Sequence, residues 1–443
     1  MKTNEKIIQF GTGNFLRGFA DCFTDSLIKQ GLFDGSTVIV SPTNSKTVEK
    51  LNAQSGKYGL LVRGIKDGKE VNGYTEISCI SRAVNPYTDF DGFISLALLP
   101  EVRFIISNTT EAGIRFDSAC KFEDAPAASF PGKLTQLLYK RFTSGLGGVV
   151  VFACELIDNN GDELKKCVLR YADLWQLGEA FKNWIEKENR FCNTLVDRIV
   201  TGFPAAEAEQ IFEKTGHRDC LLDTAEPYHL WVIEGDFENE LPLKKGGVNV
   251  IWTNNCAPYK KMKVRILNGS HTLMCFPSLL CGMETVGESL KDGLMNEFLQ
   301  RCLFGYILPM LGETEENRSF ADAVLERFEN PFIRHEWRSI SLNSVSKFTA
   351  RVLPTVNDLK ERTGSVPAPF ALSLACLIKY YREYEPSDAP DAVNFIGNEP
   401  LFTVLKSSGL WGEDISYLSG NVSECLTRIE RDGIREAIRW SLS

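Results

Sequence analysis

The sequence has no long hydrophobic run. Nowhere in its 443 residues does it approach the roughly 18 consecutive apolar residues that a membrane-spanning helix needs. The opening segment, MKTNEKIIQF, also lacks the apolar core that a secretory signal peptide contains. We therefore expect a protein of the cytoplasm that has no membrane partner.

The chain has fewer basic than acidic residues, and its cysteines are not paired. The net charge of −9 argues against nucleic acid or an anionic membrane as a general partner, but it leaves room for a local basic pocket. The 13 cysteines include no CxxC pair, and the two closest are Cys275 and Cys281. This spacing favours reduced thiols over a zinc knuckle or a disulfide framework.

The chain is long enough for two or more domains, and its composition is that of an ordinary globular protein, with 43% hydrophobic and 24% charged residues. Segments with strand and helix patterns alternate in the first half, whereas helical spacing predominates in the second half. We therefore predict an α/β N-terminal domain at residues 1–246 and an all-helical C-terminal domain at residues 247–443.

A glycine-rich turn lies near the N-terminus. The apolar run at residues 6–10 is followed at once by GTGNFLRG at residues 11–18, then by an amphipathic stretch to about Gln30 and a second apolar run at residues 37–41. A strand, a glycine turn, a helix and a strand open a dinucleotide-binding unit, in which glycines let the backbone approach a pyrophosphate. The third glycine of the usual G-x-G-x-x-G pattern is Leu16, so an ordinary glycine turn remains an alternative.

The candidate cofactor residues come from this turn and from the ends of the following strands. Polar residues just past a strand's carboxyl end lie where doubly wound sheets bind ligands, although helix caps and turns use the same residue types. Arg17 could pair with phosphate or stand in solvent. The full set is Gly11, Gly13, Asn14, Phe15, Arg17, Thr43, Asn108, Thr109 and Glu111.

No acidic residue follows the second apolar run, where one usually binds the hydroxyls of the adenosine ribose. The residues at 42–46 are PTNSK, and Lys46 could accommodate a 2′-phosphate. The residues alone therefore leave NAD and NADP as alternatives.

Further strands surround the dinucleotide-binding unit. Residues 58–80 alternate apolar and polar side chains with glycines between them, which predicts antiparallel hairpins inserted before the next parallel strand at residues 102–107. Another buried strand at residues 148–153 leads to Asn160, which is either a turn former or a second donor to a substrate oxygen. Asp197, in a later strand, is either a surface residue or a substrate ligand.

The stretch at residues 260–282 carries the side chains that we expect to perform the chemistry. Lys263, Asn268 and His271 follow one another at spacings of five and three. On an α-helix Asn268 lies about 140° and His271 about 80° from Lys263, on one broad side. An amine that exchanges a proton, an amide that holds an oxyanion and an imidazole donor suit the interconversion of an alcohol and a ketone. The alternative is an amphipathic core helix with polar edge residues.

Several of these segments together resemble the mannitol dehydrogenase family over nearly the whole chain. The opening motif G-x-G-x-F-x-R-G stands at residues 11–18, and K-x4-N-x2-H stands at residues 263–271. VDRI, WVIE and ERFxNPxI stand at residues 196–199, 231–234 and 326–333. Each motif alone is unspecific, but their combination is highly specific.

The resemblance implies a Rossmann-type N-terminal domain, a helical substrate domain and an NAD-dependent oxidoreductase that works without a metal. It implies that Lys263 is the general acid/base, while Asn268, Asn160 and His271 hold the substrate oxygen. Within the family, CELIDNNG, DRIVTGFP and KVRILNGSHT are most similar to the members that interconvert tagaturonate and altronate.

Such a hexuronate or aldonate substrate carries a carboxylate, and we expect basic residues to bind it. Lys260 stands where several polyol-specific members carry an acid, and a cation there suits a carboxylate. Lys347 and Arg351 are four residues apart, so they share one face of a helix. The alternative to binding a carboxylate is that this face is exposed to solvent. Asp197 completes the expected substrate residues.

Two other functions remain possible from the sequence. Another enzyme of the family would act on fructuronate and mannonate, or on a neutral hexitol such as mannitol. A protein of a different class would be a nucleotide-binding sensor without catalysis, although the intact Lys263, Asn268 and His271 favour an enzyme. We expect a monomer or a homodimer.

Overall fold

The computed structural model describes residues 4–110 and 112–443. The chain forms two compact units: residues 1–63 and 70–257 make up unit 1, and residues 64–69 and 258–443 make up unit 2. Unit 1 extends past the boundary that we predicted after residue 246, because strand β12 (Val250–Thr253) pairs with β11 (Leu230–Glu234) of the same unit.

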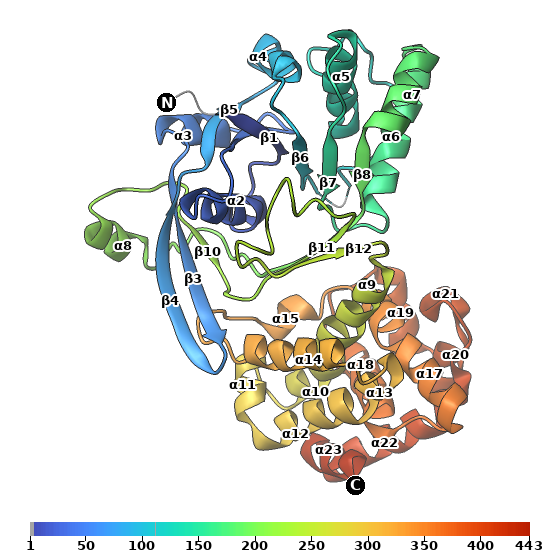
Figure 1. Cartoon of the computed structure of the whole chain (residues 1–443). Coiled ribbons are helices and arrows are strands. Elements are labelled where there is room, and N and C mark those ends of the chain that lie inside the picture. The colour runs from blue at the N-terminus through green and yellow to red at the C-terminus, as the bar shows by residue number, and fades with distance from the viewer. Residues whose placement is uncertain (1–3, 111) are drawn as a thin grey trace. The chain divides into compact units, whose positions relative to one another are not determined.

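A six-stranded parallel sheet organises unit 1, in the order β5-β2-β1-β6-β7-β8 (Figure 1). Its strands are β1 (Glu5–Phe10), β2 (Ser36–Val40), β5 (Ile80–Val84), β6 (Phe104–Ser107), β7 (Val150–Ala153) and β8 (Arg190–Cys192). The strand order reverses between β1 and β6, which is the point at which open parallel sheets bind ligands.

Both faces of this sheet are covered, which is why its strands are continuous apolar runs in the sequence. One face packs on α4 (Phe90–Ser95), α5 (Phe130–Thr143), α6 (Asn160–Leu174) and α7 (Glu179–Glu188). The other face packs on α2 (Ala20–Lys29) and on strands β9, β11 and β12.

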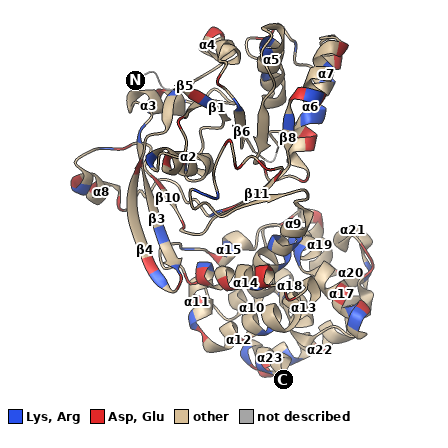
Figure 2. Cartoon of the chain, viewed as in Figure 1, with Lys and Arg blue, Asp and Glu red and all other residues tan. Residues whose placement is uncertain are grey.

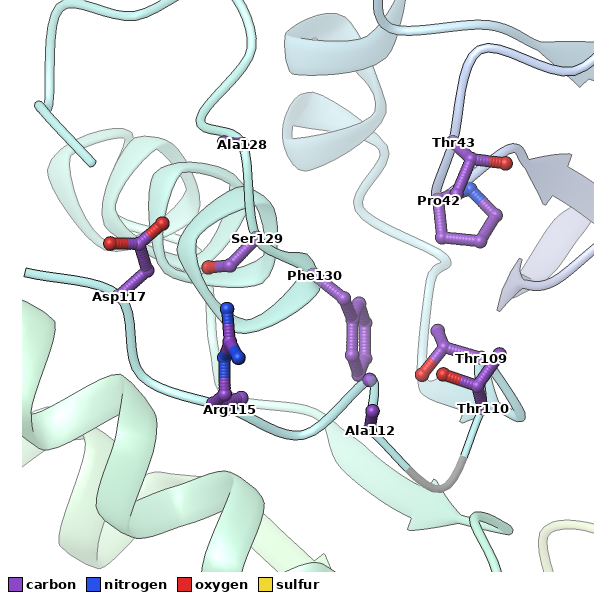
Figure 3. Close-up of a pocket in the computed structure, with 11 residues that line it drawn as sticks. Pro42, Thr43, Thr109, Thr110, Ala112, Arg115, Asp117, Ala128, Ser129 and Phe130 are labelled. Atoms are coloured by element: carbon purple, nitrogen blue, oxygen red, sulfur yellow. The ribbon is translucent and has the colours of Figure 1, made fainter. Parts of the chain in front are cut away.

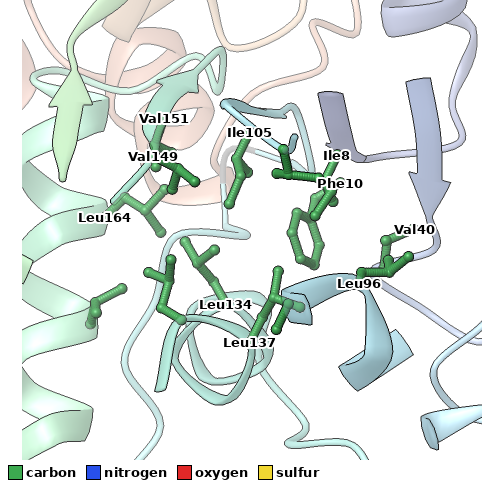
Figure 4. Close-up of a cluster of buried hydrophobic side chains, with 14 of the residues drawn as sticks. Ile8, Phe10, Val40, Leu96, Ile105, Leu134, Leu137, Val149, Val151 and Leu164 are labelled. Carbon is green, nitrogen blue, oxygen red and sulfur yellow. The ribbon is translucent and has the colours of Figure 1, made fainter. Parts of the chain in front are cut away.

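The first of these cores is formed by aliphatic and aromatic side chains from both layers (Figure 4). Ile8 and Ile105 come from the strands, and Leu134, Leu137 and Leu164 come from α5 and α6. This core fixes the carboxyl ends of β1 and β6, from which the cofactor loops emerge.

The amphipathic stretch that ends near Gln30 is divided into α1 (Asn14–Arg17) and α2. Gly18 lies at the break, and a β-carbon on Gly18 would lie 2.9 Å from the Val200 side chain. The break therefore lets the chain after α1 pass close to Val200.

Two three-stranded sheets and two further helices complete the α/β part of the chain. The first sheet has the order β10-β3-β4 and the second has the order β12-β11-β9. Their remaining elements are β3 (Tyr58–Lys66), β4 (Lys69–Ile77), β9 (Thr194–Asp197) and β10 (Asp223–Ala225), and the helices are α3 (Thr47–Ala53) and α8 (Ala208–Thr215). The pairing of β3 with β4 agrees with the predicted inserted hairpin, but the prediction was wrong at residue 80, because β5 joins the parallel sheet beside β2.

Apart from residues 64–69, unit 2 is built from helices around a buried central one, α10 (Gly269–Leu280). Every residue of α10 from Gly269 to Ser278 is buried, and α10 packs on α12, α15, α16 and α18. The other helices are α9 (Ala257–Lys263), α11 (Val286–Lys291), α12 (Gly293–Cys302), α13 (Leu308–Leu311), α14 (Glu315–Phe328), α15 (Trp337–Ile340), α16 (Ser344–Arg351), α17 (Leu353–Thr363), α18 (Ala368–Glu383), α19 (Pro390–Asn398), α20 (Leu401–Lys406), α21 (Ser408–Trp411), α22 (Ser419–Asp432) and α23 (Ile434–Leu442).

The predicted fold class is confirmed: a Rossmann-type sheet with an inserted hairpin precedes an all-helical C-terminal part. Among the described helices, none combines the length and apolar character that crossing a bilayer requires. The 13 cysteines are all free thiols.

Candidate active site

The glycine turn of unit 1 lies at the carboxyl ends of β1 and β6. The Gly11 N–H donates to Val40 O at 3.1 Å, and the Asn108 N–H donates to Phe10 O at 3.1 Å. Gly11 has a φ of +142°, and a β-carbon there would lie 2.8 Å from both Asn108 O and Leu16 Cδ1. Only glycine therefore lets the chain turn so close to the neighbouring strand.

Gly13 and Asn14 lie on the open side of the turn. Both are exposed, and no atom of the described residues lies within 4 Å of the position that a Gly13 β-carbon would take. The missing side chain leaves the backbone accessible, as close approach to a pyrophosphate requires. The turn therefore fits a dinucleotide. Phe15 stacks on Phe19 with centroids 5.0 Å apart, which gives Phe15 a packing role.

Arg17 is buried, with 4% of its surface exposed. Its guanidinium donates to Leu221 O and to Asn14 Oδ1, and it lies 3.8 Å from the Asp223 carboxylate. Burial raises the pKa of Asp223 to about 6, and the charge of Arg17 opposes this rise. The alternative of a solvated Arg17 is therefore wrong, because the guanidinium is buried and holds Asn14 and the interior of unit 1. The pairing of Arg17 with phosphate stays a prediction.

A cavity of about 440 Å³ lies beyond the carboxyl ends of β2 and β6 (Figure 3). Pro42 and Thr43 line one side of it, and Arg115, Ser129 and Phe130 line the opposite side. Its size and its place at the ends of parallel strands suit the adenosine half of a dinucleotide.

Thr109, another predicted cofactor residue, also lines this cavity but is held by a buried acid. Its N–H and its hydroxyl both donate to Glu155 Oε1 at 3.1 Å, and the Ser107 hydroxyl donates to Glu155 Oε2 at 3.0 Å. Burial raises the pKa of Glu155 against these hydrogen bonds. The Asn108 amide donates to Cys154 O. Glu111 lies outside the described residues.

Asn160 is buried and hydrogen-bonded to the backbone. It is 1% exposed, and its amide donates to Glu155 O and Thr194 O, both at 3.0 Å. Its Oδ1 accepts from the N–H groups of Gly161 and Thr194, both at 2.9 Å. In this structure both amide hydrogens of Asn160 therefore bind the backbone, and its role toward the substrate oxygen stays a prediction.

In unit 2, a π-helical turn at Val264–Asn268 joins α9 to α10. A π-helix closes its hydrogen bonds between residues five apart, so Lys263 and Asn268 lie about one turn apart on the helix. The separation of about 140° that an α-helix predicts is wrong here. The π turn brings the amine and the amide closer than the sequence indicated.

His271 follows on the first turn of α10 and is 8% exposed. Its ring stacks on Phe328 with centroids 4.2 Å apart and meets His335 edge-on at 4.8 Å. Among the described residues, its buried Nε2 has no hydrogen-bond partner. A buried polar atom without a hydrogen bond costs about 1–3 kcal/mol of stability. A ligand that forms a hydrogen bond with Nε2 would remove this cost.

The surroundings of His271 are basic. Burial lowers its pKa well below the usual value, and the neighbouring His335, Arg327, Arg351 and Lys347 lower it further. His271 is therefore a neutral imidazole at pH 7. Its environment is rich in positive charge, as an anionic ligand requires.

Arg351 and Lys347 of α16 also belong to this cluster. This agrees with the prediction that the two residues share one face of a helix. A β-carbon on Gly269 would lie 3.2 Å from Arg351 O, so α10 and α16 pack closely at this point. Burial lowers the pKa of both basic residues, and Arg351 lowers that of Lys347 further. The Lys347 ammonium donates to Ile340 O at 2.8 Å, whereas no described residue binds the Arg351 guanidinium.

The remaining predicted substrate residues lie in different units. Lys260 is on α9 of unit 2 together with Lys261 and Lys263 (Figure 2), and burial lowers the pKa of Lys260. Asp197 is buried at the end of β9 in unit 1. The structure thus groups Lys263, Asn268, His271, Lys347 and Arg351 within unit 2, while Asp197 and the cofactor turn belong to unit 1.

Sequence reasoning missed two members of the basic cluster, Arg327 and His335. Arg327 stands inside the ERFxNPxI motif, but the motif served only to recognise the family. His335 follows that motif by two residues and belongs to no periodic pattern, so the sequence offered no signal for it. In the described part of the chain, no three His, Cys, Asp or Glu side chains gather as a metal site would require.

The sequence of the chain matches two known domain families. The mannitol dehydrogenase Rossmann domain matches residues 5–245, and the mannitol dehydrogenase C-terminal domain matches residues 255–430. These two matches confirm the resemblance that the motifs indicated.

Curated relatives cover nearly the whole chain. An altronate oxidoreductase of Bacteroides thetaiotaomicron is 42% identical over 99% of this chain and 97% of its own length. Proteins of the same name from Bacillus subtilis and Escherichia coli are 40% and 39% identical, each over 98% of this chain and over 94% and 96% of their own lengths.

Solved structures share the fold. A D-sorbitol dehydrogenase in substrate-free form has a TM-score of 0.86 at 24% identity, covering 98% of this chain and 95% of its own. A Pseudomonas fluorescens mannitol 2-dehydrogenase, in a ternary complex with NAD and D-mannitol, has a TM-score of 0.75 at 22% identity, covering 100% of this chain and 95% of its own. With both domains matched and relatives near 40% identity, the chain belongs to the mannitol dehydrogenase family.

Proposed function

We propose that the protein is an NAD-dependent altronate oxidoreductase, which interconverts tagaturonate and altronate. The observation that carries this proposal is the basic cluster around His271, on the same helical segment as Lys263 and Asn268. A neutral hexitol has no use for buried cations, whereas a hexuronate supplies the carboxylate that balances them. The names of the relatives near 40% identity support the same substrate.

The turn at Gly11 and Gly13 and the cavity lined by Thr43 would hold the dinucleotide. When bound, NADH supplies the hydride that the keto carbon accepts. We favour NAD over NADP because of the family resemblance. A kcat/KM with NADPH equal to or above that with NADH would overturn this choice.

Lys263 performs the proton transfer in this proposal. In reduction, its ammonium donates a proton to the substrate oxygen as the keto carbon becomes an alcohol, and in oxidation its neutral amine takes the proton back. The Asn268 amide donates a hydrogen bond to the same oxygen while negative charge develops there. The neutral His271 ring binds the substrate through its unpaired Nε2.

Arg351 and Lys347 bind the substrate carboxylate. Arginine suits this task because its planar guanidinium makes two parallel hydrogen bonds to a carboxylate. Lys347 still has ammonium hydrogens available after its bond to Ile340 O. Lys260 adds positive charge from α9.

The first experiment compares keto substrates at pH 7 by NADH oxidation. We expect tagaturonate to give a higher kcat/KM than fructuronate, and both acids to exceed the neutral ketoses tagatose and fructose. A neutral ketose that matches or exceeds both acids would contradict the proposal, and a preference for fructuronate would move the enzyme to another substrate within the family.

The second experiment replaces Arg351 by Gln. Losing a charge-assisted hydrogen bond costs about 1.5–3 kcal/mol, so the KM for tagaturonate should rise about ten- to hundredfold. Activity on tagatose should not fall, because that substrate has no carboxylate. Lys260→Gln should act in the same direction.

Arg362→Gln is the matched control, because Arg362 is an exposed arginine of the neighbouring helix α17. Its KM values should equal those of the wild type. Equal losses on tagaturonate and tagatose in Arg351→Gln would show that Arg351 supports the fold rather than the carboxylate.

A further inference from the structure

His335 belongs to the basic cluster but has no role in the reaction described above. Its N–H donates to Ile333 O at 3.0 Å, and its carbonyl accepts from the Val286 N–H at 3.0 Å. The bond to Ile333 O closes a tight turn around Arg334, and His335 is more buried than either of its neighbours. Arg334 and Glu336 are exposed and paired with each other at 3.0 Å, whereas His335 is half-buried and directed inward.

The charged groups around the His335 ring come from three helices. His271 of α10 meets it at a centroid distance of 4.8 Å, and Arg327 of α14 acts on its charge. Lys347 and Arg351 of α16 act on His271 in the same cluster. On the outer side, Arg334 pairs with Glu336 and, at 2.6 Å, with Glu284.

Neither ring nitrogen of His335 has a hydrogen-bond partner among the described residues. The ring is therefore available to a ligand, and it lies next to the imidazole that we assign to the substrate. Because it is half-buried, it is also able to exchange a proton with solvent.

We propose that His335 is a specificity-determining residue, which binds a proton when the substrate carboxylate enters the basic cluster and thereby favours an acidic sugar over a neutral one. This proposal rests on the proposed function, since it requires a carboxylate substrate. It adds proton uptake from solvent to the binding step and leaves the hydride and proton transfers at the keto group unchanged.

The direction of the pH effect follows from the charges. In the free protein, burial and then Arg327 lower the pKa of His335 from its usual value of 6.5, so the ring is neutral at pH 7. A carboxylate within about 4–6 Å raises the pKa of an imidazole, because it stabilises the imidazolium. The affinity for the acid is therefore highest below the free-state pKa, and it falls as pH rises from that pKa to the pKa in the complex.

His271 cannot serve this purpose as readily. It is enclosed, and its pKa is lowered by burial and by four basic neighbours, much more strongly than that of His335. A neutral sugar gains nothing from protonation of His335. The preference for the acidic over the neutral sugar therefore changes about tenfold for each unit by which the carboxylate raises the pKa of His335.

The test is the ratio of kcat/KM for tagaturonate to kcat/KM for tagatose, measured with NADH between about pH 5 and pH 8, where histidine titrates. Taking the ratio cancels the effects of pH on the steps that both substrates share. We expect the wild-type ratio to fall about tenfold across this range and the ratio of His335→Gln to be independent of pH. His217→Gln is the matched control, because His217 is exposed in unit 1, and it should behave as the wild type.

Proton uptake is also measured directly, from the heat of altronate binding in two buffers with different ionisation enthalpies. The wild type should take up a fraction of a proton near pH 7, and His335→Gln should take up none. A flat wild-type ratio, or a slope that persists in His335→Gln, would overturn the inference while leaving the uronate activity intact. Absence of turnover or binding with either acid would instead overturn the proposed function, and this inference with it.

Discussion

Gly13 is the residue whose replacement tests the cofactor turn most simply. A side chain there meets no described atom of the protein, so Gly13→Val should fold normally. The valine would nevertheless stand where the backbone must approach the pyrophosphate. We expect NADH affinity, measured by fluorescence titration, to fall at least about tenfold, a loss of about 1.4 kcal/mol.

Gly73→Val is the control for this substitution, because Gly73 is exposed on β4 and equally open. It should bind NADH as the wild type does. Unchanged NADH affinity in folded Gly13→Val protein would show that the turn is structural only.

The sequence could single out those site residues that belong to a motif with a known use. Gly11 and Gly13 were singled out by their place after an apolar run, and Lys263 and His271 by the resemblance to the family's K-x4-N-x2-H motif. The hydrogen bonds between Asn160 and Thr194 could not be predicted, because Thr194 lies far away in the sequence. His335 gave no signal because only packing brings it to His271.

At the scale of elements, the π turn at Val264–Asn268 determines how Lys263 and Asn268 are placed. Arg265 of this turn is buried and pairs with Asp358 of α17. A π turn is less favourable than α-helix over the same residues and is held by its surroundings, often at functional sites. We therefore propose that this ion pair positions Lys263 and Asn268, the two residues to which we assign the proton transfer and the oxyanion contact.

Asp358→Asn should lower kcat about tenfold while leaving NADH affinity unchanged, since small displacements of catalytic groups cost rate. Asp358→Glu should restore most of kcat because it keeps the charge. Asp432→Asn is the control, because Asp432 forms an exposed pair with Arg431 at 2.6 Å. If kcat and NADH affinity fell together in Asp358→Asn, the pair would support the fold and not the placement of Lys263.

The elements that the sequence predicted well are the strands with continuous apolar runs, such as β1 and β7. Strand β5 was missed because its sequence, ISRAV, places polar residues inside a strand at the edge of the sheet. Strand β8 has only three residues and carries no periodicity. The π turn could not be predicted at all, because the sequence pattern was compared with α-helical spacing alone.

At the scale of the whole molecule, a buried acid in unit 1 makes stability depend on pH. Asp21 accepts from the Gln9 amide at 3.3 Å and lies 3.2 Å from the Tyr58 hydroxyl, which donates to Arg17 O at 2.8 Å. Burial raises the pKa of Asp21 from 3.8 to about 7, although these hydrogen bonds and Arg17 oppose the rise. The folded protein therefore keeps a proton on Asp21 that the unfolded chain releases.

Stability should consequently fall as pH rises from about 4 to about 7, since the folded state binds more protons than the unfolded state in this window. Asp21→Asn removes the ionisation, so it should raise Tm relative to the wild type by at least about 2 °C more at pH 8 than at pH 4. Asp34→Asn should show no such gain at pH 8, because Asp34 is exposed and its pKa is lowered by Lys6. An equal Tm difference for Asp21→Asn at both pH values would refute the raised pKa.

The central claim is that this protein reduces a keto-hexuronate with a proton from Lys263. Its most direct test is stopped-flow mixing of NADH-loaded protein with tagaturonate, for the wild type and for Lys263→Ala. We predict that the wild type oxidises its bound NADH in a single turnover, whereas Lys263→Ala binds NADH with unchanged affinity and oxidises it about 10²–10⁴-fold more slowly. A single-turnover rate in Lys263→Ala within a few-fold of the wild type, at every pH, would contradict the account.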